Sequence, residues 1–381
     1  MNFQFATANR IIFGADSCQQ LADLINGRRV MLVMGSNPGR HQPILDQLAA
    51  AGVAYAVFSV ANEPTVRVIN AGVTQAREHK SEIVVAIGGG SVIDAGKAIA
   101  AITTNAGELL TYLEVVGDGQ PLAVDPLPMI AVPTTAGTGA EVTKNAVITV
   151  EQQDVKVSLR DNRMLPTVAL VDPALTISVP QAVTATTGLD ALTQVIEPYV
   201  SRLATPLTDA LCRDAIPRGA AALRTVCQHP DDLAARTEMM YVSLLGGLAL
   251  ANAKLGAVHG FAGILGGVTG AAHGAICGCL LPHVTEANIK ALQANDDTAT
   301  LARYAEIAAW VTGQANATLD DLVVGLHALV TDLAVPSLGA MGLNEHAIPA
   351  VVAGSQRSSS MKGNPITLPP AILTAILQAA F

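Results

Sequence analysis

Short apolar runs alternate with amphipathic stretches through the first half of the chain. The runs are rich in valine and isoleucine and occupy residues 30–34, 55–60, 83–87, 129–132 and 168–171. Nearly continuous apolar runs of this length are typical of strands that are covered on both faces. Right-handed crossovers between them predict a parallel, doubly wound α/β sheet, with ligands bound at the carboxyl ends of its strands.

Residues 142–159 follow a different pattern. Apolar residues at 148 and 150, and again at 155, 157 and 159, alternate with polar ones on either side of the polar segment 151–154. This alternation predicts a β-hairpin inserted in the sheet domain, with a solvent-exposed tip.

After Pro180, long stretches rich in alanine and leucine replace the short runs, at residues 207–226, 237–252, 298–311 and 319–333. These stretches predict helices. A chain of 381 residues suits two domains, and Pro173 and Pro180 mark their boundary. We therefore predict an α/β domain over residues 1–180 and an all-helical domain over residues 181–381, with the active cleft where the two face each other.

The composition excludes some classes of partner. Half of the residues are hydrophobic, the formal net charge is −9 and the isoelectric point is about 5.3. Nucleic acids and anionic membranes are bound through clustered Lys and Arg, so we expect neither partner. Residues 1–13 lack the apolar core of a signal peptide, which makes the cytoplasm the expected location.

Five cysteines, without the spacing of a disulfide framework, indicate reduced thiols. Cys277 and Cys279 form a close pair, but the second pair that a structural zinc knuckle requires is missing. We interpret both as buried small residues and predict no disulfide.

A glycine-rich turn lies between the apolar run 83–87 and a helix start. It consists of Gly88, Gly89, Gly90 and Ser91. Glycines allow close approach of a phosphate and positive φ angles, while the helix N-terminus attracts the anion. The turn is neither a P-loop nor the G-x-G-x-x-G fingerprint, because Ser91 and Ile93 stand where those motifs need glycine. A tight turn without a ligand remains the alternative interpretation.

A second loop rich in threonine and glycine, residues 132–143, follows another buried run. It offers hydroxyl groups and a flexible backbone at the same sheet edge. We expect the two loops to face one nucleotide.

The two loops together resemble those of the iron-dependent (group III) alcohol dehydrogenases, a family that lies near glycerol dehydrogenases and dehydroquinate synthases. Further matching segments are residues 62–65, 171–173, 188–192, 196–197 and 281–284. The resemblance implies a Rossmann-like N-terminal domain, an all-helical C-terminal domain and assembly as a homodimer. It also implies NAD(P)-dependent hydride transfer on a small alcohol or aldehyde. In the dinucleotide cleft it places Gly88–Ser91 on the pyrophosphate, together with Asp94, Thr134, Thr135, Thr138, Asn145 and Lys156.

The coenzyme preference depends on Gly35, Ser36 and Asn37, which follow the run 30–34. NAD-preferring relatives carry an acidic residue there that would repel a 2′-phosphate. We therefore predict that NADP(H) is accepted, with Arg40 near the phosphate. A plain strand-ending turn is the alternative.

By the same resemblance, Asp190, Gln194, His259 and His273 hold Fe(II) or Zn(II), and Asp190, His259 and His273 take part in catalysis. The family has histidine where this chain has Gln194. An amide oxygen binds such metals more weakly than imidazole, so we expect reduced metal affinity. Gly263 is a second departure, because relatives place a further histidine there. Ordinary polar residues of a helical hairpin are the alternative, and we interpret His283 as structural.

Other activities remain open at this point. Loss of an imidazole suits a metal-independent reductase of keto acids, of the maleylacetate type. A dehydroquinate-synthase-like lyase would need several basic residues to bind a sugar phosphate, and the helical half offers few. A protein that binds the cofactor without turnover is the remaining alternative.

Overall fold

The computed structural model describes residues 2–153 and 155–381. Two residues lie outside the described ones. They are Met1, in the N-terminal stretch predicted to lack a signal peptide, and Asp154, in the predicted hairpin tip. Contacts within the chain divide it into two compact units. The first, the sheet unit, comprises Ala6–Thr135 and Gly139–Ser178, and the second, the helical unit, comprises Val179–Phe381 with two short segments, residues 2–5 and Ala136–Thr138.

The sheet unit contains six parallel strands in the order β1-β8-β5-β4-β2-β3. Their bounds are β1 Arg10–Phe13, β2 Val30–Gly35, β3 Tyr55–Val60, β4 Ile83–Gly88, β5 Met129–Pro133 and β8 Val168–Val171. The five strands predicted from apolar runs are confirmed to within one residue at each end. The sequence interpretation missed β1, whose short apolar segment pairs with β8 at the sheet edge.

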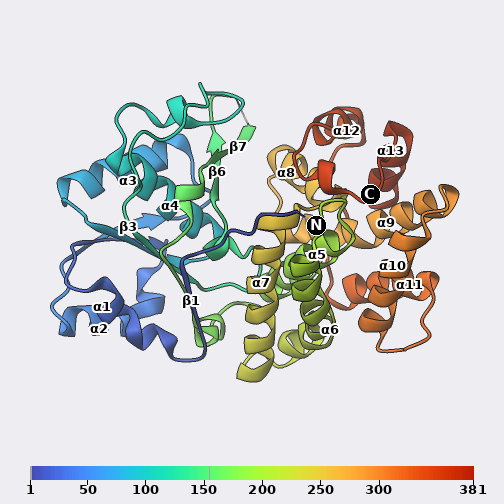
Figure 1. The fold of residues 1–381 in the computed structure, drawn as a ribbon, viewed down its shortest axis with the longest axis horizontal. Helices are drawn as coiled ribbons and strands as arrows, with labels where there is room; N and C mark the ends of the chain where they lie inside the picture. Colours follow the sequence, from blue (N-terminus) through green and yellow to red (C-terminus); the bar gives the residue numbers. More distant parts are fainter. Residues whose placement is uncertain (1, 154) are drawn as a thin grey trace. The chain divides into compact units, whose positions relative to one another are not determined.

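Helices cover both faces of this sheet (Figure 1). In β2, Met31 and Val33 belong to the core formed with α3 (Val66–Glu78) and α4 (Gly90–Thr104). The alternate residues Val30, Leu32 and Met34 belong to the core formed with α1 (Leu21–Ile25) and α2 (Gln42–Ala50). Burial on both faces explains the continuous apolar runs, and the predicted doubly wound α/β class is confirmed.

The predicted hairpin forms a separate two-stranded sheet. Strands β6 (Asn145–Val150) and β7 (Val155–Arg160) pair antiparallel. Ala146 and Ile148 pack in the same core as α4, while residues 151–153 at the tip are exposed. The hairpin therefore lies on the α3/α4 side of the parallel sheet.

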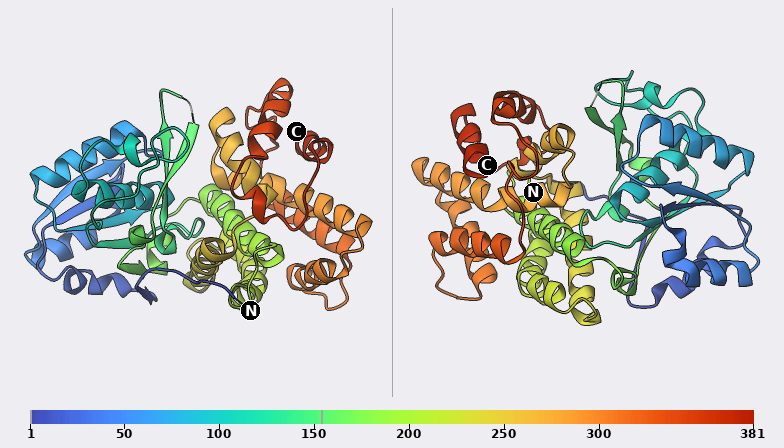
Figure 2. Two further views of the ribbon diagram at one scale, coloured as in Figure 1. Left: turned by 45° about the horizontal axis from the view of Figure 1, so that its top comes forward. Right: turned by 180° about the vertical axis from the view of Figure 1, so that it is seen from behind.

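Regular structure in the described residues of the helical unit is helical throughout (Figure 2). The helices are α5 Gln181–Val200, α6 Pro206–Gln228, α7 Leu233–Ala253, α8 Ala257–Thr269, α9 His273–Ala294, α10 Thr298–Thr312, α11 Leu319–Asp332, α12 Ile348–Ser355 and α13 Pro370–Ala379. Four of them, α6, α7, α10 and α11, confirm the predicted helical stretches. Helix α5 packs against α6, α7 and α9 and is buried along most of its length.

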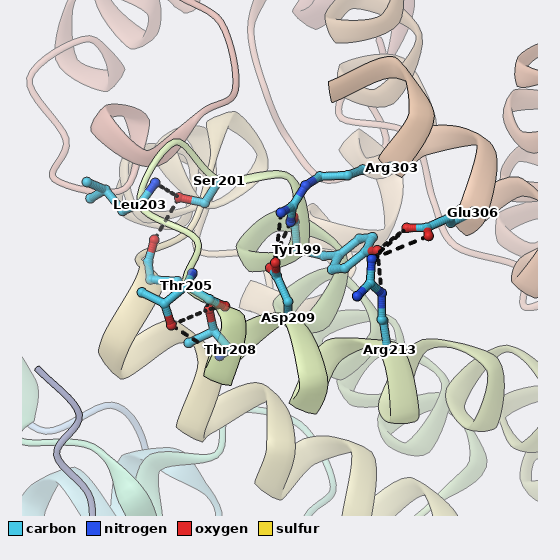
Figure 3. Close-up of polar contacts among 10 residues, drawn as sticks. Tyr199, Ser201, Leu203, Thr205, Thr208, Asp209, Arg213, Arg303 and Glu306 are labelled. Carbon is cyan, nitrogen blue, oxygen red and sulfur yellow. Dashed lines mark hydrogen bonds and ion pairs between the residues drawn. The ribbon is translucent and has the colours of Figure 1, made fainter. Parts of the chain in front are cut away.

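A polar cluster fixes the C-terminal end of α5 (Figure 3). The Tyr199 hydroxyl donates to Glu306 of α10 and accepts a hydrogen bond of 2.9 Å from Arg213 Nε of α6. Arg303 of α10 lies over the Tyr199 ring and makes two hydrogen bonds of 2.7 Å to the carboxylate of Asp209. Such bidentate pairs are geometrically specific, so α5, α6 and α10 are held together at this point.

Among the described helices, none alone is long and apolar enough to cross a membrane. The pair formed by α7 and α8 passes on length and composition, but it is bent by 100°.

Candidate nucleotide and metal sites

Three of the segments predicted to bind the nucleotide follow neighbouring strands. Gly35 ends β2, Gly88 ends β4 and Pro133 ends β5, and these strands lie side by side in the order β5-β4-β2. The connection from β2 leads to β3 on one side of the sheet, and the connection from β4 leads to β5 on the other. This is a topological switch point, where open α/β sheets bind ligands at the carboxyl ends of their strands. Ser36 and Asn37 are exposed at this edge.

The glycine turn leads directly into α4, which begins at Gly90. The first N–H groups of an α-helix lack intrahelical acceptors and can receive an anion. None of Gly88, Gly89 and Gly90 has a positive φ, so that part of the sequence argument is wrong. Gly88 is explained by lack of space for a side chain, because a Cβ there would lie 2.6 Å from the side chain of Val92.

The structure brings the threonine-rich loop against this turn. The Thr134 amide donates a hydrogen bond of 3.0 Å to the Gly88 carbonyl. A Cβ on Gly89 would lie 3.3 Å from Thr135 Oγ1. The two predicted loops therefore meet within the sheet unit. Thr138 has its contacts in the helical unit.

The other predicted nucleotide residues take part in a polar network. Lys97 Nζ donates to the Asn145 carbonyl at 2.8 Å and to Thr143 Oγ1 at 2.9 Å, and it lies 3.5 Å from Asp94 Oδ1. Asp94 Oδ2 accepts from the Val147 amide. This network ties α4 to the hairpin, and both oxygens of Asp94 have partners, one in Lys97 of α4 and one in the Val147 amide of the hairpin. Lys156, on β7, forms an ion pair with Glu63.

Burial shifts the pKa values of two charged residues around this network, Lys97 and Glu141. It lowers the pKa of Lys97 against the opposing charges of Asp94 and Glu141. It raises the pKa of Glu141 to about 7, against a backbone hydrogen bond and the charge of Lys97. Glu141 Oε1 has no hydrogen-bond partner among the described residues. Lys97 and Glu141 are therefore buried charged groups that support the loop from below.

Three of the four predicted metal ligands converge within the helical unit. Asp190 lies on α5, His259 on α8 and His273 at the start of α9. Asp190 Oδ1 is 3.1 Å from His259 Nε2 and 3.8 Å from His273 Nε2. The Asp190 and His259 side chains are 3% and 5% exposed, whereas that of His273 is 40% exposed. The cluster is therefore accessible from the His273 side.

A carboxylate contacts the ring nitrogen of His259 that faces away from Asp190. Glu197, two turns after Asp190 on α5, lies with Oε2 at 2.7 Å from His259 Nδ1 and accepts a hydrogen bond of 2.7 Å from the Val258 amide. Donation from Nδ1 to Glu197 leaves Nε2 directed at Asp190. A carboxylate in this position is the usual outer partner of a metal-binding histidine. The sequence interpretation noted Glu197 only as a matching segment, without this role.

Gln194, the fourth predicted metal ligand, has one end of its amide group engaged by the backbone. Its Nε2 donates a hydrogen bond of 2.9 Å to the carbonyl of Gly137, a residue that belongs to the helical unit. Its Oε1 is buried and has no hydrogen-bond partner among the described residues. One oxygen therefore remains available to a ligand while the amide nitrogen is engaged.

Cys277 takes a place among the donors that the sequence interpretation did not foresee. It is buried on α9, one turn after His273, and its Sγ lies 3.8 Å from His259 Nε2. Donor atoms of Asp190, His259, His273 and Cys277 all lie within 4.8 Å of one another. The signal in the sequence was the His-x-x-x-Cys spacing, which places both side chains on one helix face. All five cysteines are free, in agreement with the absence of a predicted disulfide.

The cluster is electrostatically coupled. The pKa of His273 is raised to about 9, first by the charge of Cys277, with burial opposing and Asp190 adding to the effect. Burial lowers the pKa of His259, but Cys277, Asp190 and Glu197 raise it well above its usual range. Burial raises the pKa of Asp190, but the two histidines hold it below its usual value. Anionic and imidazole donors that converge in this way fit a divalent cation.

Gly263 and His283, the two other positions considered from the sequence, have different surroundings. A Cβ added at Gly263 on α8 would meet nothing within 4 Å. A side chain at this position would therefore have room. His283 makes an edge-on contact with His327, with ring centroids 4.9 Å apart, which supports the interpretation of His283 as structural.

Comparison with known proteins shows which family this chain belongs to. The model of the iron-containing alcohol dehydrogenases matches residues 8–173, and that of the C-terminal part of the Fe-containing alcohol dehydrogenase family matches residues 184–381. The chain belongs to the iron-containing alcohol dehydrogenase family. As a member it is an oxidoreductase of the alcohol dehydrogenase class, which disfavours the lyase considered from sequence.

Individual members of the family are similar over the whole chain. Alcohol dehydrogenase 4 of Saccharomyces cerevisiae is 33% identical, over 97% of this chain and 96% of its own. The solved structure of a 1,3-propanediol oxidoreductase is 33% identical and covers 100% of both chains, with a TM-score of 0.92. The structure of a sulfoacetaldehyde reductase from Bifidobacterium kashiwanohense in complex with NAD+ is 28% identical, with a TM-score of 0.89, and covers 100% of this chain and 99% of its own.

Proposed function

We propose that the protein transfers hydride reversibly between NAD(P)(H) and a small alcohol/aldehyde pair, with the help of a divalent metal, Fe(II) or Zn(II). The observation that carries this proposal is the convergence of Asp190, His259 and His273, with Glu197 behind His259, in a member of the iron-containing alcohol dehydrogenase family. The complex of the sulfoacetaldehyde reductase with NAD+ supports the coenzyme class.

Each unit has its own task in this proposal. In the sheet unit, the N-terminus of α4 and the turn Gly88–Ser91 hold the pyrophosphate, and Thr134 and Thr135 line the same site. In the helical unit, Asp190, His259 and His273 hold the metal. When bound, the metal supplies a Lewis acid that polarises the substrate oxygen. Glu197 keeps His259 Nε2 directed inward, and the exposed side of His273 gives the substrate access.

The coenzyme pocket is proposed to accept NADP(H) as well as NAD(H), because Gly35, Ser36 and Asn37 at the end of β2 carry no negative charge. Cytoplasmic residence and assembly as a homodimer stay predictions from the sequence.

The test is direct. Protein purified without added metal is subjected to elemental analysis and then assayed with NADH and NADPH on a panel of aldehydes, before and after chelation and with Fe(II) or Zn(II) restored. We expect chelator-sensitive oxidation of the coenzyme that metal restores. Equal activity of fully stripped and reconstituted enzyme would contradict the metal, and turnover of keto acids but not of aldehydes would contradict the substrate class.

A further inference from the structure

We propose that the thiolate of Cys277 is the fourth ligand of the metal and replaces the imidazole that this chain lacks at Gln194. The inference rests on the proposed metal site and goes beyond it, because it assigns a donor of a different chemical kind from the one that the sequence resemblance implied.

The distances support a tetrahedral shell. Zinc binds nitrogen and oxygen at about 2.0–2.1 Å and sulfur at about 2.3 Å, so tetrahedral donors lie about 3.3 Å apart when both are nitrogen or oxygen and about 3.6 Å apart when one is sulfur. Here Asp190 Oδ1 is 3.1 Å from His259 Nε2 and 3.8 Å from His273 Nε2, and Cys277 Sγ is 3.8 Å from His259 Nε2. All four donor atoms lie within 4.8 Å of one another, so side-chain movements of about 1 Å would bring them to one ion.

The surroundings of Cys277 distinguish it from an ordinary core cysteine. A buried thiol usually lies among apolar side chains. Cys277 instead lies among a carboxylate and two imidazoles. Its neighbour in sequence, Cys279, points elsewhere and approaches the carbonyl of Ala380 at 3.7 Å. Of these two buried cysteines, Cys277 is the one whose sulfur converges on the donors.

Gln194 is the competing candidate, and its chemistry is weaker. Its amide nitrogen is engaged by the Gly137 carbonyl, so it can offer one neutral oxygen. Soft thiolate ligands favour zinc, while amide oxygen favours harder ions such as magnesium and calcium. A shell of Asp190, Cys277 and two histidines also neutralises the charge of a divalent ion, whereas one carboxylate with three neutral ligands leaves a net positive charge. We therefore expect this member of the family to retain zinc.

Two measurements on the whole protein test the assignment. X-ray absorption of the zinc-loaded wild-type protein should show one sulfur neighbour at about 2.3 Å. Replacement of zinc by Co(II) should give a near-ultraviolet sulfur-to-cobalt charge-transfer band. Cys277→Ser should abolish that band and weaken zinc binding by more than about 100-fold, beyond the roughly 10- to 100-fold that loss of an outer partner costs. Cys279→Ser is the matched control, and Gln194→Ala separates the competing ligand; both should keep the band.

The outcomes are distinguishable from those for the proposed function. A zinc shell of nitrogen and oxygen alone, or a band that survives Cys277→Ser, overturns the thiolate ligand even if metal-dependent hydride transfer is observed. Failure to bind zinc or cobalt overturns it as well. A sulfur neighbour in a protein that reduces no aldehyde supports the ligand assignment and contradicts the proposed function. If Cys277→Ser does not fold, the wild-type absorption measurement decides alone.

Discussion

Glu197 Oε2 lies 2.7 Å from His259 Nδ1, and the same carboxylate accepts a hydrogen bond from the Val258 amide at the start of α8. One side chain on α5 therefore fixes both the position of α8 and the orientation of the imidazole ring. The link is sensitive to charge, since both partners donate to the carboxylate.

Glu197→Gln should weaken metal binding by roughly 10- to 100-fold, the usual effect of losing an outer partner of a histidine ligand. The amide can accept from one of the two donors, but its NH2 group then faces the other. Titration of the stripped protein with zinc measures the effect. Glu286→Gln, which removes an exposed ion pair with Lys290 on α9, is the control and should bind zinc as the wild type does. Equal affinity in both variants would contradict the role of Glu197.

Two glycines of the same region should respond oppositely to alanine. Gly263 lies inside α8 with open space at its Cβ position, so Gly263→Ala should stabilise the protein by about 0.5–1 kcal/mol. A Cβ on Gly256 would lie 2.7 Å from Glu197 Oε1 and 3.0 Å from Asn364 Oδ1, so Gly256→Ala should destabilise it by about 1–3 kcal/mol. Urea unfolding of both variants checks the sign. A stabilised Gly256→Ala would show that the Glu197 site tolerates displacement.

The sequence predicted what depends on local periodicity. Buried parallel strands must be apolar on both faces, so five of them could be found from continuous apolar runs. The glycine turn was placed correctly because a strand precedes it and a helix follows it. Strand β1 was missed because Arg10–Phe13 is short and is recognised as a strand only from its pairing with β8.

The metal site was harder to predict because its donors come from three helices. Resemblance brought Asp190, His259 and His273 together, but it could not show that the amide nitrogen of Gln194 is bound to the Gly137 carbonyl, which leaves only the amide oxygen for a metal. Cys277 and Glu197 could not be assigned from spacing alone. A cysteine in an apolar run is usually structural, and the burial that makes Cys277 a candidate arises from the packing of α5 and α8 on α9.

Glu141 should make stability depend on pH. Burial raises its pKa from 4.5 to about 7 in the folded protein. The protonated form is favoured by folding, so its stabilising contribution is present below pH 4.5 and is lost as the pH rises through about 7. Glu141→Gln removes this titration. Relative to the wild type, the variant should gain stability between pH 5 and 8, by up to about 3 kcal/mol. Denaturant unfolding of both proteins across this range measures the difference, and a constant difference would contradict the raised pKa.

Asn37→Asp tests the coenzyme prediction at the end of β2. Asn37 is exposed and is followed by the short helical segment Pro38–His41, which carries Arg40. A carboxylate here should repel the 2′-phosphate of NADPH and leave NADH binding intact or improved. A repulsion of about 1.4 kcal/mol corresponds to roughly a tenfold fall in the ratio of kcat/KM for NADPH to that for NADH. Gln152→Glu adds the same charge at the exposed hairpin tip and serves as the control. If the ratio falls equally in both variants, net charge sets the preference, and not a local contact with the 2′-phosphate. An unchanged ratio in Asn37→Asp would place that phosphate away from β2.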